Sequence, residues 1–236
     1  MNQVNSATRP SLVVLTGAGI SAESGLGVFR GSGGLWENFR IEEVASIEGW
    51  HADPAKVLMF YNLRRRQAEK AQPNAGHLAL VALEKDFDVT VITQNVDDLH
   101  ERAGSSKVIH LHGMLSQGRS QIDDRQICDL TGKSIELGDT CELGGQLRPN
   151  IVWFGEMVPM YDQARVIVQQ ADKLLIVGTS LQVYPAAGLL YERQAHAETV
   201  LVDPNEVEIH EGGGTIEVIR ASATQGLPAL AARWMS

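Results

Sequence analysis

Short apolar runs recur along the chain and alternate with stretches of helical pattern. Most of these runs are continuously apolar, which is typical of strands covered on both faces of a parallel sheet. Strands are therefore predicted at Leu12–Thr16, Val89–Thr93, Val108–Leu111, Ile151–Trp153, Leu174–Val177, Val200–Val202 and Ile216–Ile219. Helical stretches such as Gly76–Lys85 and Asp162–Ala171 lie between them. This alternation predicts an α/β fold with a doubly wound, parallel, Rossmann-like sheet.

Two segments interrupt the alternation. Residues 31–73 have a helical pattern without a strand, and Met114–Gln146 is polar, rich in Asp, Gly and Ser, and typical of a small irregular module. Both are interpreted as insertions that build a second, smaller lobe. The Rossmann-like domain is expected at residues 1–30, 76–113 and 147–236, and the smaller lobe at residues 31–75 and 114–146.

Composition excludes several classes of protein. The chain has 236 residues, of which 44% are hydrophobic, so general disorder is excluded. It contains no run of roughly 20 apolar residues and starts with a polar segment, so we expect a cytoplasmic protein without a membrane partner. The formal charge is −9, and the only dense basic run is Arg64-Arg65-Arg66. Nucleic acid is therefore not expected as a ligand.

A glycine-rich turn follows the first predicted strand. Gly17-Ala18-Gly19-Ile20-Ser21-Ala22 has the G-x-G-x-x-A pattern, in which glycines let the backbone approach a pyrophosphate at a helix N-terminus. A tight turn that only packs a strand on a helix is the structural alternative. Dehydrogenases carry an acidic residue about 20 positions further on. Here a second glycine-rich loop with Phe29 and Arg30 follows instead, which disfavours an oxidoreductase and suits a loop that folds over a cofactor.

Polar side chains follow the other predicted strands, at the edge where an open parallel sheet binds its ligands. They are Thr93-Gln94-Asn95-Val96-Asp97, His110 and His112, Gly178-Thr179-Ser180, and Asp203. Each has a structural alternative, such as an Asx turn, a helix cap or a buried histidine. Either histidine could be a general base, with the other buried. Their coincidence at the strand ends favours one binding site.

These motifs resemble the sirtuin family, in the family's order and over nearly the whole chain. The matching segments are Gly17–Ser21, Phe29-Arg30, Thr93–Asp97, His112-Gly113, Val152–Glu156, Gly178–Ser180 and Val183–Ala187. The resemblance implies an NAD-dependent protein-lysine deacylase that consumes NAD and releases nicotinamide and O-acyl-ADP-ribose. His112 would be the general base, with Asn95 and Asp97 also catalytic. The residues implied for NAD binding are Gly17, Ala18, Gly19, Ile20, Ser21, Phe29, Arg30, Trp36, Gln94, Asn95, Asp97, Gly178, Thr179, Ser180, Asp203 and Ala223.

The resemblance also implies a site for an acylated lysine in a protein substrate. An extended peptide would lie between two segments of the chain, and its acyl group would enter a pocket. The residues implied for the peptide are Val152, Phe154, Gly155, Glu156, Val183 and Tyr184. Tyr61 and Arg64 resemble the pair found in bacterial desuccinylases and demalonylases, and Ala45 matches a small residue that widens the acyl pocket. On pattern alone, Arg64 lies on a mainly apolar helix face, where an arginine often only covers the core.

One departure from the family concerns zinc. Relatives carry two CxxC pairs, and the corresponding positions here are Ser120, Asp123, Cys141 and Gly144. A single thiolate cannot form a tetrahedral zinc site, so we expect no bound metal. Three other functions stay open on the sequence: an NAD- or FAD-linked oxidoreductase, a non-catalytic NAD or ADP-ribose sensor, and a mono-ADP-ribosyltransferase.

Overall fold

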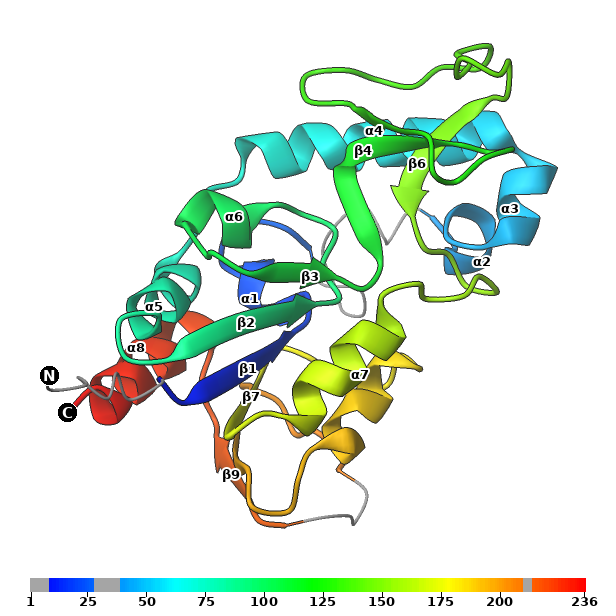
Figure 1. Cartoon of the computed structure of the whole chain (residues 1–236). Helices are drawn as coiled ribbons and strands as arrows, with labels where there is room; N and C mark the ends of the chain where they lie inside the picture. Colours follow the sequence, from blue (N-terminus) through cyan, green and yellow to red (C-terminus); the bar gives the residue numbers. More distant parts are fainter. Residues whose placement is uncertain (1–8, 28–38, 210–213) are drawn as a thin grey trace, which may run out of the picture.

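A six-stranded parallel sheet forms the centre of the larger lobe in a computed structural model, which describes residues 9–27, 39–209 and 214–236. The strand order is β3-β2-β1-β7-β8-β9 (Figure 1). The strands are β1 Ser11–Thr16, β2 Asp88–Thr93, β3 Val108–His110, β7 Lys173–Val177, β8 Glu198–Val202 and β9 Ile216–Ile219. The doubly wound sheet is therefore confirmed. Its order reverses between β1 and β7, where a crevice opens at the carboxyl ends of the strands.

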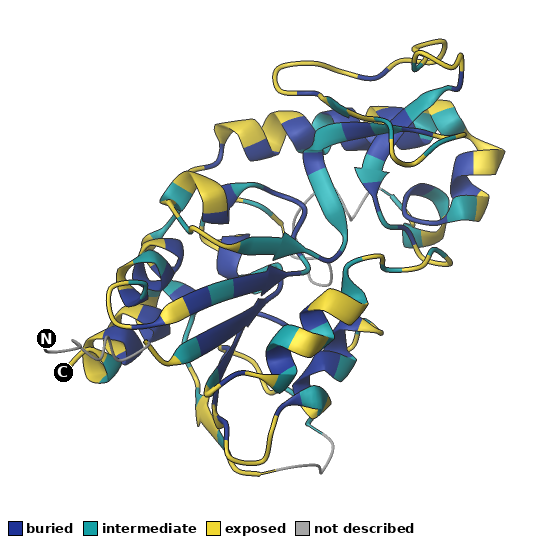
Figure 2. Cartoon of the chain, in the orientation of Figure 1, coloured by how far each residue is buried: buried dark blue, intermediate teal, exposed yellow. Residues whose placement is uncertain are grey.

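Helices cover both faces of this sheet, as the continuously apolar strands require. On β1, Leu12 and Val14 face one core cluster with α5 (Ala75–Leu83) and α8 (Ala223–Trp234). Val13 and Leu15 face the opposite cluster with α7 (Tyr161–Gln169) and the 3-10 helix η2 (Ala186–Glu192). Figure 2 shows the buried strands between helices whose outer surfaces are exposed.

The smaller lobe contains its own three-stranded antiparallel sheet in the order β5-β4-β6. Its strands are β4 Gly113–Ser120, β5 Ile127–Asp129 and β6 Leu147–Ile151, and its helices are α2 Ile41–Val44, α3 Ile47–Ala52 and α4 Pro54–Lys70. The prediction of a main-sheet strand at Ile151–Trp153 is wrong, because β6 ends at Ile151 and pairs with β4. The expected start of the larger domain at residue 147 accordingly falls at the first residue of a small-lobe strand.

The segment Met114–Gln146 is also more regular than expected. Most of β4 and all of β5 lie within it, although β4 contains many polar residues and β5 is only three residues long. Burial along β4 alternates only partly, and the pairing of β4 with β6 shifts register between Gly113 and Gly118. A strand of this kind is stabilised by the strands with which it pairs. Its own sequence contains no apolar run from which it could be predicted.

The helix α4 begins where the sequence predicts. The Asp53 carboxylate accepts a hydrogen bond from the backbone N–H of Lys56 at 2.9 Å, and Pro54 occupies the first turn. Val57, Tyr61 and Ala68 are buried. The face of α4 expected to point inward is therefore largely buried, with Arg64 half-buried, and the buried surface extends beyond it to Leu58, Phe60, Asn62 and Arg65.

Two histidines, His77 on α5 and His100, are fully buried beside each other, with ring centroids 5.0 Å apart. Burial lowers the pKa of His77 to about 4 and of His100 to about 3. Both pKa values lie below the unfolded value of about 6.5, so the unfolded chain binds more protons as the pH falls below that value. Stability is therefore present above pH 6.5 and lost as the pH falls toward 4.

We expect these two histidines to lower the free energy of unfolding by about 4 kcal/mol between pH 7 and pH 5, roughly 2 kcal/mol each. Urea unfolding at a series of pH values measures this. His100→Gln should remove about half of the pH dependence, whereas His196→Gln, at an exposed position, should leave it unchanged. An unaltered pH dependence in His100→Gln would contradict this assignment.

Candidate active site

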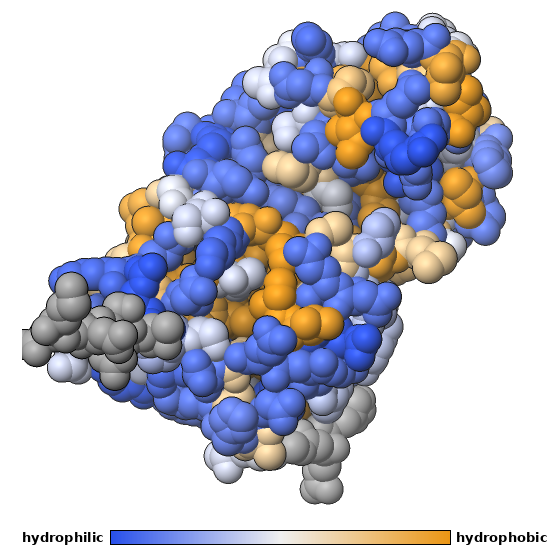
Figure 3. All heavy atoms as spheres, viewed as in Figure 1, coloured by the Kyte–Doolittle hydropathy of each residue, from blue (hydrophilic) through white to orange (hydrophobic). Residues whose placement is uncertain are grey.

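A cavity of about 500 Å³ opens at the carboxyl ends of the parallel strands and extends to the smaller lobe. It is lined by the segments that follow β1, β2, β7 and β8, and by small-lobe residues. On the face shown in Figure 3, apolar residues are exposed near the junction of the lobes and on the small lobe. The cavity-lining residues among those expected from the sequence are Gly17, Ala18, Gly19, Ser21, Ala45, Tyr61, Arg64, Gln94, Asn95, Asp97, His112, Val152, Phe154, Gly155, Glu156, Gly178, Thr179, Ser180, Val183, Tyr184 and Asp203.

The turns after β1 and β7 pack directly on each other. The backbone N–H of Gly17 donates to Val177 O at 3.0 Å, and that of Gly19 donates to Gly178 O at 2.8 Å. A Cβ atom on Gly17 would lie 2.7 Å from Gly178 O, so a larger residue would force the turns apart. The glycines therefore serve both close packing and backbone access to the cavity. Ile20 points away from the cavity into the core.

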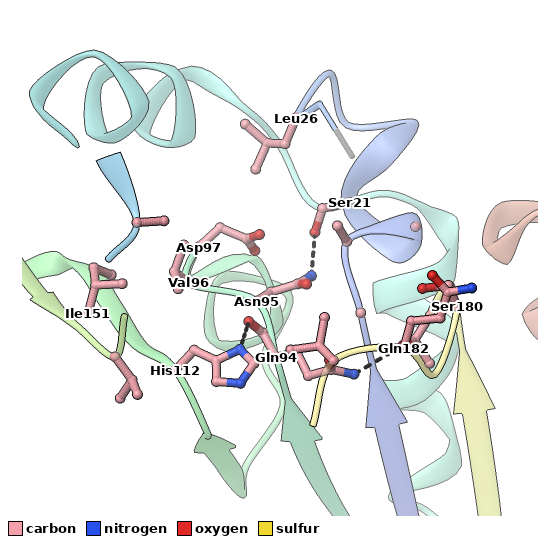
Figure 4. A pocket seen from close by; sticks show the side chains of 18 of the residues that line it. Ser21, Leu26, Gln94, Asn95, Val96, Asp97, His112, Ile151, Ser180 and Gln182 are labelled. Atoms are coloured by element: carbon pink, nitrogen blue, oxygen red, sulfur yellow. Dashed lines mark hydrogen bonds between the residues drawn. The ribbon is translucent and has the colours of Figure 1, made fainter. Parts of the chain in front are cut away.

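The segment Asn95–Asp97 after β2 is held by hydrogen bonds from three sides. Thr93 Oγ1 accepts from the backbone N–H of Asn95 at 2.9 Å, and the Asn95 side-chain amide donates to Ser21 Oγ at 3.1 Å (Figure 4). The backbone N–H of Leu115 donates to Val96 O at 2.7 Å. Asp97 is buried, and burial raises the pKa of its carboxyl. An amide and a carboxylate are thus presented to the cavity in fixed positions, where they can hydrogen-bond a carboxamide or a hydroxyl group.

The two candidate histidines have different surroundings. His112 lines the cavity, and its Nδ1 lies 3.1 Å from the carbonyl oxygen of Gln94 (Figure 4). A carbonyl only accepts, so Nδ1 carries the proton and Nε2 is the basic nitrogen. Burial lowers the pKa of His112, which keeps the ring neutral near pH 7. These are the properties of a general base.

His110 is part of a separate contact with Glu101. Its Nε2 lies 2.8 Å from Glu101 Oε1, and its Nδ1 lies 3.0 Å from Asn95 O. Burial disfavours the charged ring, but the hydrogen bond and charge of Glu101 outweigh burial and raise the pKa of His110. Of the two histidines, His112 lines the cavity and His110 is engaged with Glu101.

Tyr61 and Arg64 extend from α4 into the cavity wall together with Ala45. The Tyr61 hydroxyl accepts a hydrogen bond from Trp153 Nε1 at 3.0 Å, and burial raises the pKa of Tyr61 to about 12. Arg64 is half-buried. Burial lowers its pKa, while the charges of Tyr61 and Asp97 favour the guanidinium. The helix thus places a cation and a hydroxyl group at one end of the cavity.

The wall formed by residues 152–156 carries exposed apolar side chains and a buried ionic brace. Phe154 is 44% exposed, and its backbone N–H donates to Ala45 O at 2.9 Å. The Glu156 carboxylate instead accepts hydrogen bonds from Arg148 at 2.7 and 2.9 Å and from Arg119 at 2.8 Å. Burial disfavours its ionised form, but Arg148 lowers the pKa of Glu156 overall. Glu156 lines the cavity, yet its carboxylate is engaged in holding this segment in place.

The far end of the cavity lies beyond β7 and β8. The buried Asp203 accepts hydrogen bonds from Asn205, at 2.8 Å from its backbone N–H. Asn205 and Glu206 also line the cavity, and sequence reasoning missed them. Their position in the sequence could have identified them, because they follow the end of β8 by only a few residues. Ala223 is buried in the core at the start of α8 and does not line this cavity.

Some expected residues lie elsewhere. Phe29, Arg30 and Trp36 fall outside the described residues.

Within the described ranges, no helix is long and apolar enough to cross a membrane.

The four positions at which the family resemblance led us to look for zinc ligands form a hydrogen-bonded corner. The buried Ser120 Oγ accepts from Cys141 Sγ at 3.1 Å and from the backbone N–H groups of Ile122 and Asp123 at 3.2 and 3.3 Å. Gly144 supplies no side chain. In residues 9–27, 39–209 and 214–236, no group of three or more His, Cys, Asp or Glu side chains could hold a metal ion. This donor set does not fit zinc.

We expect metal analysis of the purified protein to find substoichiometric zinc, and a chelator to leave activity unchanged, because one thiol and one carboxylate cannot complete a tetrahedral site. The triple variant Ser120→Cys, Asp123→Cys, Gly144→Cys is the positive control and should acquire zinc. Tightly held zinc at one equivalent in the unaltered protein would overturn this expectation.

The sequence and the fold match known proteins over most of their length. A sequence profile of the Sir2 family matches residues 17–185. An NAD-dependent protein deacylase of Bacteroides thetaiotaomicron is 51% identical over 225 residues, which cover 93% of this chain and 96% of that protein. An NAD-dependent protein deacylase of Helicobacter pylori is 52% identical over 200 residues, which cover 85% of this chain and 87% of that protein. The crystal structure of a Sir2 homolog–NAD complex has a TM-score of 0.85 and 39% identity, covering 95% of this chain and 89% of that one.

Proposed function

This chain belongs to the Sir2 family and is an NAD-dependent protein deacylase, and we propose that it prefers lysine acyl groups that end in a carboxylate. Succinyl and malonyl groups are the proposed substrates, with acetyl groups also accepted. The observation that carries this proposal is the placement of Arg64 and Tyr61 together in the cavity wall, in the same cavity as His112.

Charge and geometry support the acyl preference. A guanidinium can bind a carboxylate through two parallel hydrogen bonds, and a tyrosine hydroxyl can donate a further one. Tyr61 is free to donate, because its oxygen uses only an acceptor position toward Trp153 Nε1. Ala45 leaves space beside them that a larger side chain would fill. An acetyl group presents no charged group to this cation, whereas a succinyl or malonyl group presents a carboxylate.

The proposed reaction assigns a role to each side chain in the cavity. Bound NAD supplies the ribose carbon that the acyl oxygen attacks as nicotinamide departs. Asn95 and Asp97 hold the carboxamide and ribose end, and the turns Gly17–Ser21 and Gly178–Ser180 let the pyrophosphate and ribose approach their backbone, although the Gly17 and Gly19 N–H groups are themselves used to join the two turns. Asp203 accepts from the hydroxyl groups of the adenosine ribose.

Proton transfer falls to His112. Its Nε2 is unprotonated in the tautomer that Gln94 O selects, so it can take a proton from a ribose hydroxyl as that oxygen reacts with the acyl carbon. Water then completes the release of lysine and O-acyl-ADP-ribose.

The experiment that tests the proposal is a panel of acetyl, malonyl, succinyl and glutaryl peptides, incubated with NAD and analysed by mass spectrometry. Faster loss of succinyl or malonyl than of acetyl, with one nicotinamide released per acyl group, supports it. Reduced nicotinamide would indicate an oxidoreductase, and ADP-ribose on the peptide would indicate ADP-ribosyl transfer. Equal rates on all acyl groups would refute the preference.

A further inference from the structure

Three consecutive arginines on α4 lie in three different environments. Arg64 is half-buried and lines the cavity, and Arg66 is exposed. Arg65 lies between them in sequence but is only 2% exposed, inside the smaller lobe. The proposed function uses Arg64, and Arg66 covers the surface. The buried Arg65 belongs neither to the proposed acyl-binding site nor to the exposed surface.

The guanidinium of Arg65 joins α4 to two other segments of the smaller lobe. Its Nε donates to Leu115 O on β4 at 2.5 Å, and its Nη1 donates to Lys133 O at 3.2 Å and to Asn62 Oδ1 at 2.8 Å. Asn62, also buried, then pairs with the backbone of Ile135, accepting from its N–H at 3.0 Å and donating to its carbonyl at 2.9 Å. The segment 133–135 is thus fastened to α4 by two side chains.

Leu115 connects Arg65 to the segment that lines the proposed NAD side of the cavity. While its carbonyl accepts from Arg65, its N–H donates to Val96 O at 2.7 Å. Val96 stands between Asn95 and Asp97, and both Leu115 and Val96 line the cavity. A continuous series of short hydrogen bonds therefore runs from α4, through one residue of β4, to the segment proposed to hold the nicotinamide end of NAD.

The hydrogen-bond acceptors of Arg65 indicate that this side chain does more than fill space in the core of the smaller lobe. In the described part of the chain its hydrogen bonds go to two backbone carbonyls and one amide, none of them a carboxylate. Burial lowers the pKa of Arg65 and outweighs the charge of Glu69, which favours the guanidinium. A buried cation that is not hydrogen-bonded to a carboxylate is costly, and an apolar side chain of similar size would fill the same space at lower cost. What an apolar side chain cannot do is hold three oxygens of three segments at fixed separations.

We infer that Arg65 is a positioning residue that sets the place of Asn95–Asp97 relative to the acyl-binding face of α4. It touches neither substrate and acts through Leu115 and Val96. The inference rests on the proposed roles of Asn95, Asp97 and Arg64. It goes beyond them in assigning the alignment of the two halves of the site to one buried side chain.

Arg65→Met keeps the volume and removes every donor. We expect it to raise the KM for NAD at least fivefold and to lower kcat on succinyl and acetyl peptides alike, because the loosened segment serves both reactions. The inhibition constant of ADP-ribose should rise less than the KM for NAD, because ADP-ribose lacks the nicotinamide carboxamide and its adenosine half binds beyond β7 and β8, away from Leu115. A side chain that only stabilises the fold would lower the melting temperature without separating these two constants.

Arg65→Lys provides a second variant in case the methionine variant does not fold. Lysine keeps the buried charge, but a single ammonium cannot reach all the acceptors in their places, so the KM for NAD should rise at least threefold. The matched control is Arg66→Met on the exposed neighbour, which should leave all constants unchanged. The inference falls if folded Arg65→Lys has the KM for NAD of the unaltered protein.

The test of Arg65 can fail or succeed independently of the test of the acyl preference. The succinyl-to-acetyl ratio of the unaltered protein decides the preference before any Arg65 variant is made. The ratio of the NAD and ADP-ribose constants in the variants then decides the role of Arg65, whichever acyl group the protein favours.

Discussion

Replacement of His112 by alanine is expected to reduce deacylation by a factor of about 10²–10⁴, the usual contribution of a general base. The ring lines the cavity, Gln94 O fixes its tautomer, and burial lowers its pKa so that Nε2 is unprotonated at neutral pH. In the alanine variant that nitrogen is missing, whereas the fold and NAD binding should be preserved. Steady-state rates with a succinyl peptide, together with calorimetric titration of NAD, measure both.

The pH profile gives an independent view of the same residue. A base must be unprotonated to act, and the pKa of His112 is lowered below its ordinary value of about 6.5. Activity should therefore persist through pH 6.5 and decline only as the pH falls further, through the lowered pKa. Near wild-type deacylation by His112→Ala would place the base elsewhere, and His196→Ala serves as the control at an exposed position.

The second large effect is expected from Arg64→Met, which should lower kcat/KM for a succinyl peptide by at least tenfold and change that for an acetyl peptide much less. Hydrogen bonds to a charged group are worth about 1.5–3 kcal/mol, which corresponds to one to two decades. The acetyl group has no carboxylate, so its reaction does not depend on this contact. Competition between the two peptides in one reaction measures the ratio directly.

The neighbouring arginine supplies the matched control. Arg66→Met removes the same charge from the same helix, but at an exposed position, and should leave the succinyl-to-acetyl ratio unchanged. Tyr61→Phe should lower the ratio less than Arg64→Met, because it removes one hydroxyl donor and leaves the cation. Equal losses on succinyl and acetyl peptides in Arg64→Met would show that Arg64 only supports the fold.

Much of the larger lobe was determined by the sequence itself. The strands of the main sheet are buried on both faces, so their residues are continuously apolar, and this local signal identifies them without knowledge of their partners. The sequence also determined which residues follow these strands and lie together at the site. Parallel strands bring their carboxyl ends to one edge, so Asn95, His112, Gly178 and Asp203 were expected together and all line one cavity.

The smaller lobe was decided by tertiary contacts. The strands β4 and β6 are partly polar and are stabilised by backbone hydrogen bonds to each other and, for β4, to β5, so local sequence did not identify them and a strand near β6 was assigned to the wrong sheet. Likewise Glu156 follows a recognisable motif, but only the folded chain shows that Arg148 and Arg119 occupy its carboxylate.

The arginine run on α4 shows the division most clearly. Helical periodicity separated Arg64 from Arg66, because one lies on the apolar face and the other does not. Periodicity gave no sign that Arg65 is the most deeply buried of the three. Its acceptors are backbone carbonyls of Leu115 and Lys133, which lie 50 and 68 positions further along the chain. A carbonyl is present at every residue and leaves no mark in the sequence, so only the tertiary structure could show which ones Arg65 would meet.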